Sequence, residues 1–135
     1  MRVKKSVAKF LRWQHVCRVA TRSRGGVPHV VPVCHVFDGE KLYFASAGKA
    51  QKIQNLRANP QIAVTVDVYA DDWSLLRGVM VQGTAALIER GARFRKIRQL
   101  LYEKFPQYPE EAALGAGDVI VEVTPRRIFS WGIDE

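Results

Sequence analysis

The chain has 135 residues, of which 47% are hydrophobic, and a formal net charge of +8. This length predicts a single domain over residues 1–135, and no apolar run reaches the roughly 20 residues that a membrane-spanning helix needs. The basic N-terminal segment lacks the apolar centre and the small-residue cleavage site of a signal peptide, so we expect a cytoplasmic protein. The positive charge favours an anionic small molecule or a nucleic acid as partner, although most basic surfaces have no specific partner.

The hydrophobic pattern predicts a short amphipathic helix near the N-terminus and then a meander of strands that two helices interrupt. The expected strands span residues 15–21, 28–37, 41–45, 61–69, 78–88, 118–123 and 127–131, with a turn at 124–126 between the last two. Gly83, inside a long strand, indicates a bulge or a close approach of backbone. Because the helices do not alternate with every strand, the order favours a small, mainly antiparallel barrel over a βαβ fold.

The stretch that follows the strand at 41–45 predicts a phosphate site. Small residues, among them Ser46 and Gly48, lead into a short helix with Lys49 and Lys52 in its opening turns. Free backbone N–H groups and the positive end of the helix dipole favour an anion there. The serine adds a hydroxyl group, and the glycine would let a ligand approach the backbone closely.

Helical spacing places Lys49 and Lys52 on the same side as Ile53 and Leu56, which should pack inward. The lysines are therefore expected at the seam between the helix and the sheet. The alternative is a surface helix whose lysines carry no ligand.

The strand at 28–37 is apolar on both faces. Val30, Pro32, Cys34 and Val36 share one face, and Val31, Val33 and Phe37 share the other. A barrel interior can cover one face, and a ligand or a second subunit can cover the other. Pro32 removes one ladder donor, so a ligand can meet exposed backbone there.

Candidate metal ligands and catalytic groups do not form a known pattern. If residues 25–26 form a two-residue hairpin tip, Cys17 lies opposite Cys34 and the thiols share a face. No zinc-type spacing occurs, so we expect no metal site and two small thiols packed in a barrel. No nucleophile motif or carboxylate pair is present, which leaves the catalytic residues unassigned and gives the chemistry to a bound cofactor.

The ordered series of motifs from about Val16 onward resembles the pyridoxamine 5′-phosphate oxidase-like, flavin-binding split-barrel family. The matching segments are Arg18-Val19-Ala20-Thr21, Pro28-His29-Val30-Val31-Pro32-Val33, Leu42-Tyr43-Phe44-Ala45-Ser46, Lys52, Asn55-Leu56, Asn59-Pro60, Ala63-Val64, Val79-Met80-Val81-Gln82-Gly83-Thr84-Ala85 and Thr124-Pro125-Arg126-Arg127-Ile128-Phe129-Ser130-Trp131-Gly132. The resemblance implies a six-stranded antiparallel split β-barrel that forms a homodimer with two flavin mononucleotides (FMN) at the subunit interface.

The resemblance also implies roles for particular residues. Lys52 and Ser46 match phosphate-side positions, and Val31, Pro32 and Val33 would run beside the flavin ring and offer backbone groups. Arg77 and Trp131 lie where a partner subunit approaches the cofactor.

The chain also departs from the oxidase proper. Val30 and His35 stand where the oxidase carries an arginine and a lysine, Gln51 replaces the arginine beside the phosphate lysine, and the substrate-binding tail is missing. These differences favour the short flavin- or deazaflavin-binding relatives over a pyridoxamine phosphate oxidase.

The leading hypothesis is an FMN-binding oxidoreductase that transfers hydride or electrons to an unknown small substrate. A reductase that uses a 5-deazaflavin on the same fold is the first alternative. A non-catalytic flavin carrier or sensor is the second, and a basic nucleic-acid-binding module is the least favoured. His35 is expected to be packed rather than catalytic.

Overall fold

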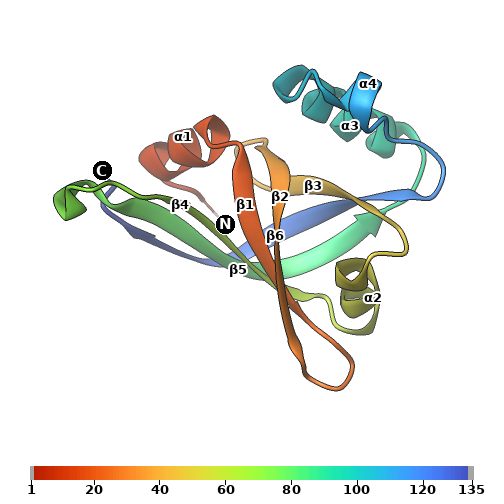
Figure 1. The fold of residues 1–135 in the computed structure, drawn as a ribbon, viewed down its shortest axis with the longest axis horizontal. Coiled ribbons are helices and arrows are strands. Elements are labelled where there is room, and N and C mark those ends of the chain that lie inside the picture. Colours follow the sequence, from red (N-terminus) through yellow and green to blue (C-terminus); the bar gives the residue numbers. More distant parts are fainter. Residues whose placement is uncertain (1, 134–135) are drawn as a thin grey trace.

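The computed structural model describes residues 2–133, which form a closed, six-stranded antiparallel barrel with helices at its ends and on one side (Figure 1). The strands are β1 (Val16–Arg22), β2 (Pro28–Phe37), β3 (Leu42–Ala47), β4 (Gln61–Val68), β5 (Arg77–Ile88) and β6 (Asp118–Trp131), in the closed order β1-β2-β3-β6-β5-β4. The helices are α1 (Lys5–Trp13), α2 (Gln51–Ala58), the 3₁₀ turn η1 (Trp73–Leu75), α3 (Ala92–Lys104) and α4 (Tyr108–Glu111). The expected mainly β barrel is confirmed.

Two apolar cores hold these elements together. The larger core fills the barrel, and α1 and α2 contribute Leu11 and Ile53 to it. The smaller core lies outside the barrel, where α3 covers Val36 of β2 and Ile120 of β6. The strand at 28–37 is therefore buried on both faces only in its second half, and Val30 in its first half is 65% exposed.

The last strand differs from the expectation of two strands joined by a turn. β6 runs unbroken through Pro125, and its register against β5 shifts between Gln82 and Gly83. Pro125 lies opposite Gly83, where the bulge relieves the missing ladder donor. The expected bulge at Gly83 is confirmed, and it is the reason that no turn is needed.

The close packing at Gly83 predicts that a larger side chain there destabilises the fold. A Cβ atom at this position would overlap the carbonyl oxygen of Thr124, which is backbone and cannot swing away. We expect Gly83→Ala to lower the free energy of unfolding by about 2 kcal/mol. Urea unfolding of this variant and of Gly115→Ala, where a Cβ meets nothing within 4 Å, makes the comparison. Equal stabilities of the two variants would contradict the prediction.

The hairpin of β1 and β2 closes one residue away from the expected register. The loop spans residues 23–27, in which the Ser23 N–H donates to the Val27 carbonyl oxygen at 2.9 Å and Gly26 has a φ of 88°. As a result Cys17 pairs with Val33, not with Cys34. The thiols lie on opposite faces of the sheet, because a shift of one residue changes the face of every side chain.

The Cys17 thiol lies in the barrel core, and burial raises its pKa to about 12. Over residues 2–133, no three His, Cys, Asp or Glu side chains are placed to share a metal ion. None of the helices in that range combines the length and the apolar character needed to cross a bilayer.

Candidate functional site

The barrel opens between β2 and β3. The ladder between these strands joins only His35–Phe37 to Leu42–Phe44. Before His35, within the described residues, β2 pairs with β1 alone, while β3 continues along β6. The helix α2 follows β3 and packs against β1 close to this opening (Figure 1).

Val31, Pro32 and Val33 lie along this edge of β2. The two valines are partly buried and pack on the barrel core, whereas Pro32 is exposed on the outer face. A ligand in the opening can therefore reach the backbone of this segment and the proline ring, but not the ends of the valine side chains.

Ser46 and Lys49 lie at the approach to α2. Ser46 is buried, and its hydroxyl donates to the Ala47 carbonyl oxygen at 3.0 Å. The helix begins at Gln51, later than the sequence pattern implies, so Lys49 lies in the preceding turn and is exposed. The seam between helix and sheet therefore holds only one of the two lysines.

Lys52 is the lysine at that seam. Lys52 is partly buried, and Ile53 and Leu56 beside it are buried. Burial lowers the pKa of the Lys52 amine. Within residues 2–133 its amine makes no ion pair, and α2 has no acidic residue in its first turn and no side-chain cap. A partly desolvated cation beside free helix N–H groups suits an anionic ligand such as a phosphate.

Gly48 has a different role from the one expected. Its N–H donates to the Gly117 carbonyl oxygen at 2.8 Å, and a Cβ atom at Gly48 would lie 2.6 Å from the same oxygen. The close approach of backbone at this glycine is therefore made by the turn before β6, not by a ligand.

A polar chain that the sequence pattern did not single out fixes α2 to β1. Asn55, only 2% exposed, donates to the Thr21 hydroxyl at 3.0 Å and accepts from the Gln51 side-chain amide at 2.7 Å. His29 pairs with Thr21 across the hairpin, and its buried Nδ1 has no hydrogen-bond partner. In the sequence, the only sign of this polar chain is that Gln51 and Asn55 are four residues apart, a spacing at which helical side chains contact each other.

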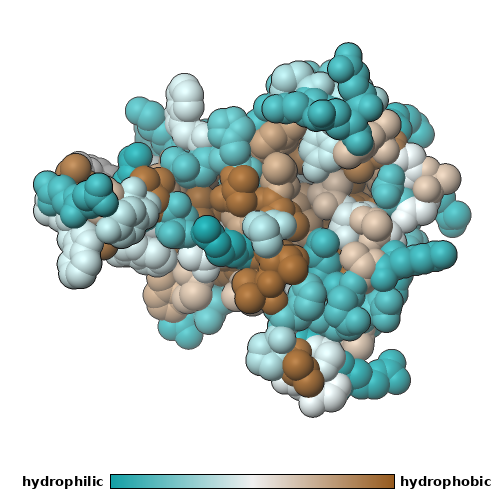
Figure 2. Space-filling model, in the orientation of Figure 1, coloured by the Kyte–Doolittle hydropathy of each residue, from teal (hydrophilic) through white to brown (hydrophobic). Residues whose placement is uncertain are grey.

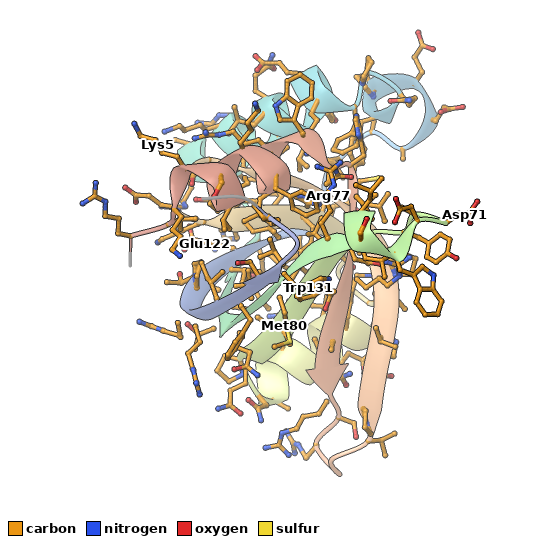
Figure 3. All side chains as sticks on the ribbon, turned by 90° about the vertical axis from the view of Figure 1, so that its left-hand side faces the viewer. Lys5, Asp71, Arg77, Met80, Glu122 and Trp131 are labelled. Carbon is orange, nitrogen blue, oxygen red and sulfur yellow. The ribbon has the colours of Figure 1, made fainter. Side chains whose placement is uncertain are left out.

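Arg77 and Trp131 lie at the other end of the barrel. Arg77 pairs with Val68, where β4 ends, whereas β4 begins at Gln61, directly after α2. The eight residues of β4 separate these points by about 23 Å at ~3.3 Å per residue. Figure 3 shows Arg77 beside α1. One chain thus does not bring these two residues together with Lys52.

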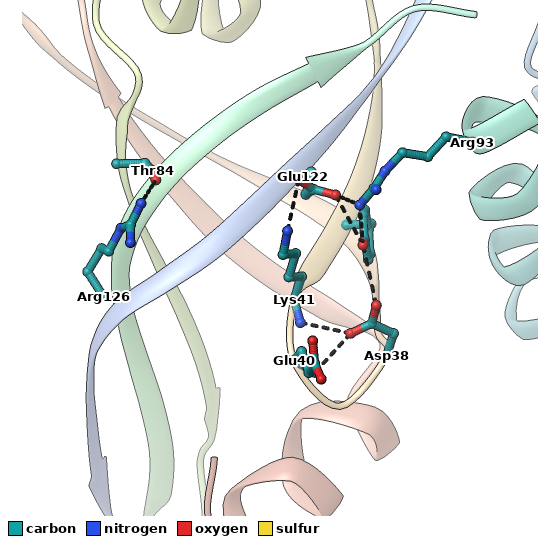
Figure 4. A network of polar contacts seen from close by, with 8 residues as sticks. Asp38, Glu40, Lys41, Thr84, Arg93, Glu122 and Arg126 are labelled. Atoms are coloured by element: carbon teal, nitrogen blue, oxygen red, sulfur yellow. Dashed lines mark hydrogen bonds and ion pairs between the residues drawn. The ribbon is translucent and has the colours of Figure 1, made fainter. Parts of the chain in front are cut away.

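A second polar network joins α3 to β3 and β6. Glu122 of β6 is buried and pairs with Arg93 and, at 3.4 Å, with Lys41 (Figure 4). Tyr43 donates to the same carboxylate at 3.2 Å, and burial raises the pKa of its hydroxyl. Every polar group here has a partner, so we interpret the network as structural.

Comparisons with known proteins agree over nearly the whole chain. The family model for pyridoxamine 5′-phosphate oxidase matches residues 3–132. A 5a,11a-dehydrotetracycline/5a,11a-dehydrooxytetracycline reductase of Streptomyces rimosus is 30% identical over 130 residues, which cover 93% of this chain and 80% of that protein.

Two solved structures are also similar to the chain. A conserved hypothetical protein of Mycobacterium tuberculosis is 25% identical, with a TM-score of 0.83 over 97% of this chain and 85% of that one. A protein described as an F420 reductase is also 25% identical, with a TM-score of 0.71 over 94% of this chain and 98% of that one.

Proposed function

Because this chain belongs to the pyridoxamine 5′-phosphate oxidase family, we propose that it is an oxidoreductase that binds FMN and acts on a small molecule. The observation that carries the choice of a phosphate-bearing cofactor is the partly buried amine of Lys52, which has no anionic partner in the described part of the chain. A phosphate at this point would supply that partner.

Each predicted residue then has a physical task. Lys52 and the first N–H groups of α2 would hold the phosphate, and the Ser46 hydroxyl can rotate from the Ala47 carbonyl oxygen to donate to it. Lys49, exposed in the turn before the helix, would add long-range attraction. The free edge of Val31–Val33 would offer backbone groups to the ring. When bound, the flavin supplies hydride transfer, and no side chain of the chain is assigned as acid or base.

The positions of Arg77 and Trp131 support a homodimer. Within one chain they lie at the far end of the barrel from Lys52, so if both contact the cofactor, as the family resemblance implies, a second copy must bring them to it. Apolar side chains gather over the middle of the face that Figure 2 shows, and Val30, Phe129 and Trp131 are among the large exposed hydrophobic residues of the strands. Light scattering on the purified protein tests this, and a monomer at micromolar concentration would contradict it.

A deazaflavin is the alternative cofactor. The similarity to an F420 reductase at 25% identity favours it, and the net charge of +8 would suit a cofactor with a polyanionic tail. The candidate residues for the phosphate and the ring are the same, so the geometry does not separate the two cofactors.

The deciding experiment is the visible absorption spectrum of the purified protein, followed by titration of the cofactor-free protein with FMN and with F420. We expect a yellow protein that releases FMN on denaturation, or an FMN affinity well above that for F420. A clear preference for F420 would give the alternative. If the protein binds neither, the proposed function is wrong.

A further inference from the structure

A cleft of about 540 Å³ lies between α1 and the ends of β5 and β6, well away from α2. Its volume falls within the range of small-molecule sites. The side chains that matter for its chemistry are those of Lys9, Phe10 and Trp13 from α1 and that of Arg77 from β5. None of the described residues that line this cleft is acidic.

Arg77 has no anionic partner among the described residues. Its guanidinium carbon lies 5.4 Å from the centre of the Phe10 ring, close enough for a cation–π contact. Over residues 2–133 it makes no ion pair, whereas Arg18, Arg57 and Arg93 each pair with a carboxylate. A planar cation that is held over a ring and keeps its N–H groups free is ready to bind a carboxylate or a phenolate.

Exposed aromatic rings flank this arginine. Trp13, on the α1 side of the cleft, is 70% exposed. Arg77 also lines an adjoining cleft of about 380 Å³, whose walls include Trp131 and Tyr69. Trp131 is 43% exposed and lies over Gly78, where a Cβ atom would overlap the indole, so its ring is held close to the strand. Two indoles beside an unpaired cation offer stacking surfaces to a flat ligand.

We propose that the cleft between α1 and the ends of β5 and β6 binds a planar aromatic anion, with the anionic group on Arg77 and the rings against Trp13. Lys9, exposed and without an ion pair in residues 2–133, adds a second positive charge. The assignment of this anion as the substrate rests on the proposed oxidoreductase function; its binding to the cleft does not.

The test is calorimetric titration of the cofactor-free protein with 2-naphthoate and with 2-naphthamide, a neutral analogue of the same shape. We expect 2-naphthoate to bind and the amide to bind at least about tenfold more weakly, because a charge-assisted hydrogen bond to Arg77 is lost. Arg77→Gln should weaken naphthoate binding by a similar factor. The matched control is Arg95→Gln, at an exposed arginine of α3 outside the cleft, and it should leave the affinity unchanged.

Three results would overturn the proposal. They are no binding of naphthoate, equal binding of acid and amide, and naphthoate binding that is lost in Lys52→Met but retained in Arg77→Gln. The comparison of acid and amide needs only the unaltered protein, so it decides the question even if a variant does not fold. Naphthoate binding with no affinity for FMN or F420 would leave the cleft in place and remove the proposed function.

Discussion

The variant Lys52→Met is expected to bind FMN about 10- to 100-fold more weakly than the unaltered protein, with no change in its affinity for riboflavin. Riboflavin has the same ring as FMN but no phosphate. If the amine of Lys52 holds the phosphate, removal of the amine weakens the binding of FMN and leaves the binding of riboflavin unchanged. The measurement is the ratio of the two dissociation constants, by fluorescence titration of the cofactor-free protein.

Two lysines that are exposed, unlike Lys52, serve as comparisons. Lys96→Met, on the outer side of α3, removes the same charge far from α2 and should leave both affinities unchanged. Lys49→Met should have a smaller effect than Lys52→Met, because Lys49 is solvated outside the helix. An equal loss for FMN and riboflavin would indicate that the variant has altered the fold of the site. An unchanged FMN affinity would remove Lys52 from it.

The parts of the fold that follow from local patterns could be predicted from the sequence. Alternation of apolar residues gave the strands, and helical spacing gave Ile53 and Leu56 as the inner side of α2, both of which are buried. A lone glycine in a long strand indicated the bulge at Gly83. Each of these signals depends on a few neighbouring residues, which is why it survives in the folded chain.

The predictions that were wrong concern features that depend on contacts between distant segments of the chain. The register of β1 and β2 depends on the geometry of the loop at 23–27, and β6 stays whole because Gly83 of another strand makes room for Pro125. Gly48 is small because a turn nearly 70 residues later in the chain packs against it. Local sequence patterns do not contain these contacts.

For the candidate site, too, the sequence predicts relations between neighbouring residues better than relations between distant ones. Ser46 and Lys52 are close in sequence, and the structure places them at the end of β3 and in the first turn of α2. Arg77 and Trp131 were grouped with them, but β4 separates the two pairs within one chain. The polar chain through Asn55 and Thr21 joins α2 to a strand more than 30 residues earlier, so only the fold reveals it.

His35 gives the second large effect, on stability at acid pH. The side chain is 0% exposed, and its Nε2 lies 2.9 Å from the Leu11 carbonyl oxygen, so it donates to α1 from the neutral ring. Its Nδ1 is buried without a partner, and protonation there would place a charge in the core. Burial, with smaller contributions from Lys104 and His15, lowers the pKa of His35 from 6.5 to about 4, and the hydrogen bond to Leu11 opposes this shift in part.

The sign of the effect follows from the proton balance. Between pH 6.5 and 4 the unfolded chain takes up a proton at His35 and the folded chain does not. The contribution of His35 to the free energy of unfolding is therefore fully present above pH 6.5. It is lost as the pH falls to 4, and the loss amounts to about 3 kcal/mol.

The measurement is urea unfolding at pH 7 and pH 4.5 for the unaltered protein and for His35→Gln, whose amide can still donate to Leu11 but does not titrate. Other groups contribute equally to both proteins, so the difference between their pH dependences isolates His35. We expect the variant to lose about 2–3 kcal/mol less than the unaltered protein on acidification. His15→Gln, at an exposed histidine that contributes least to the pKa shift of His35, should retain most of the dependence. Parallel losses in all three proteins would mean that His35 takes up its proton without disturbing the fold.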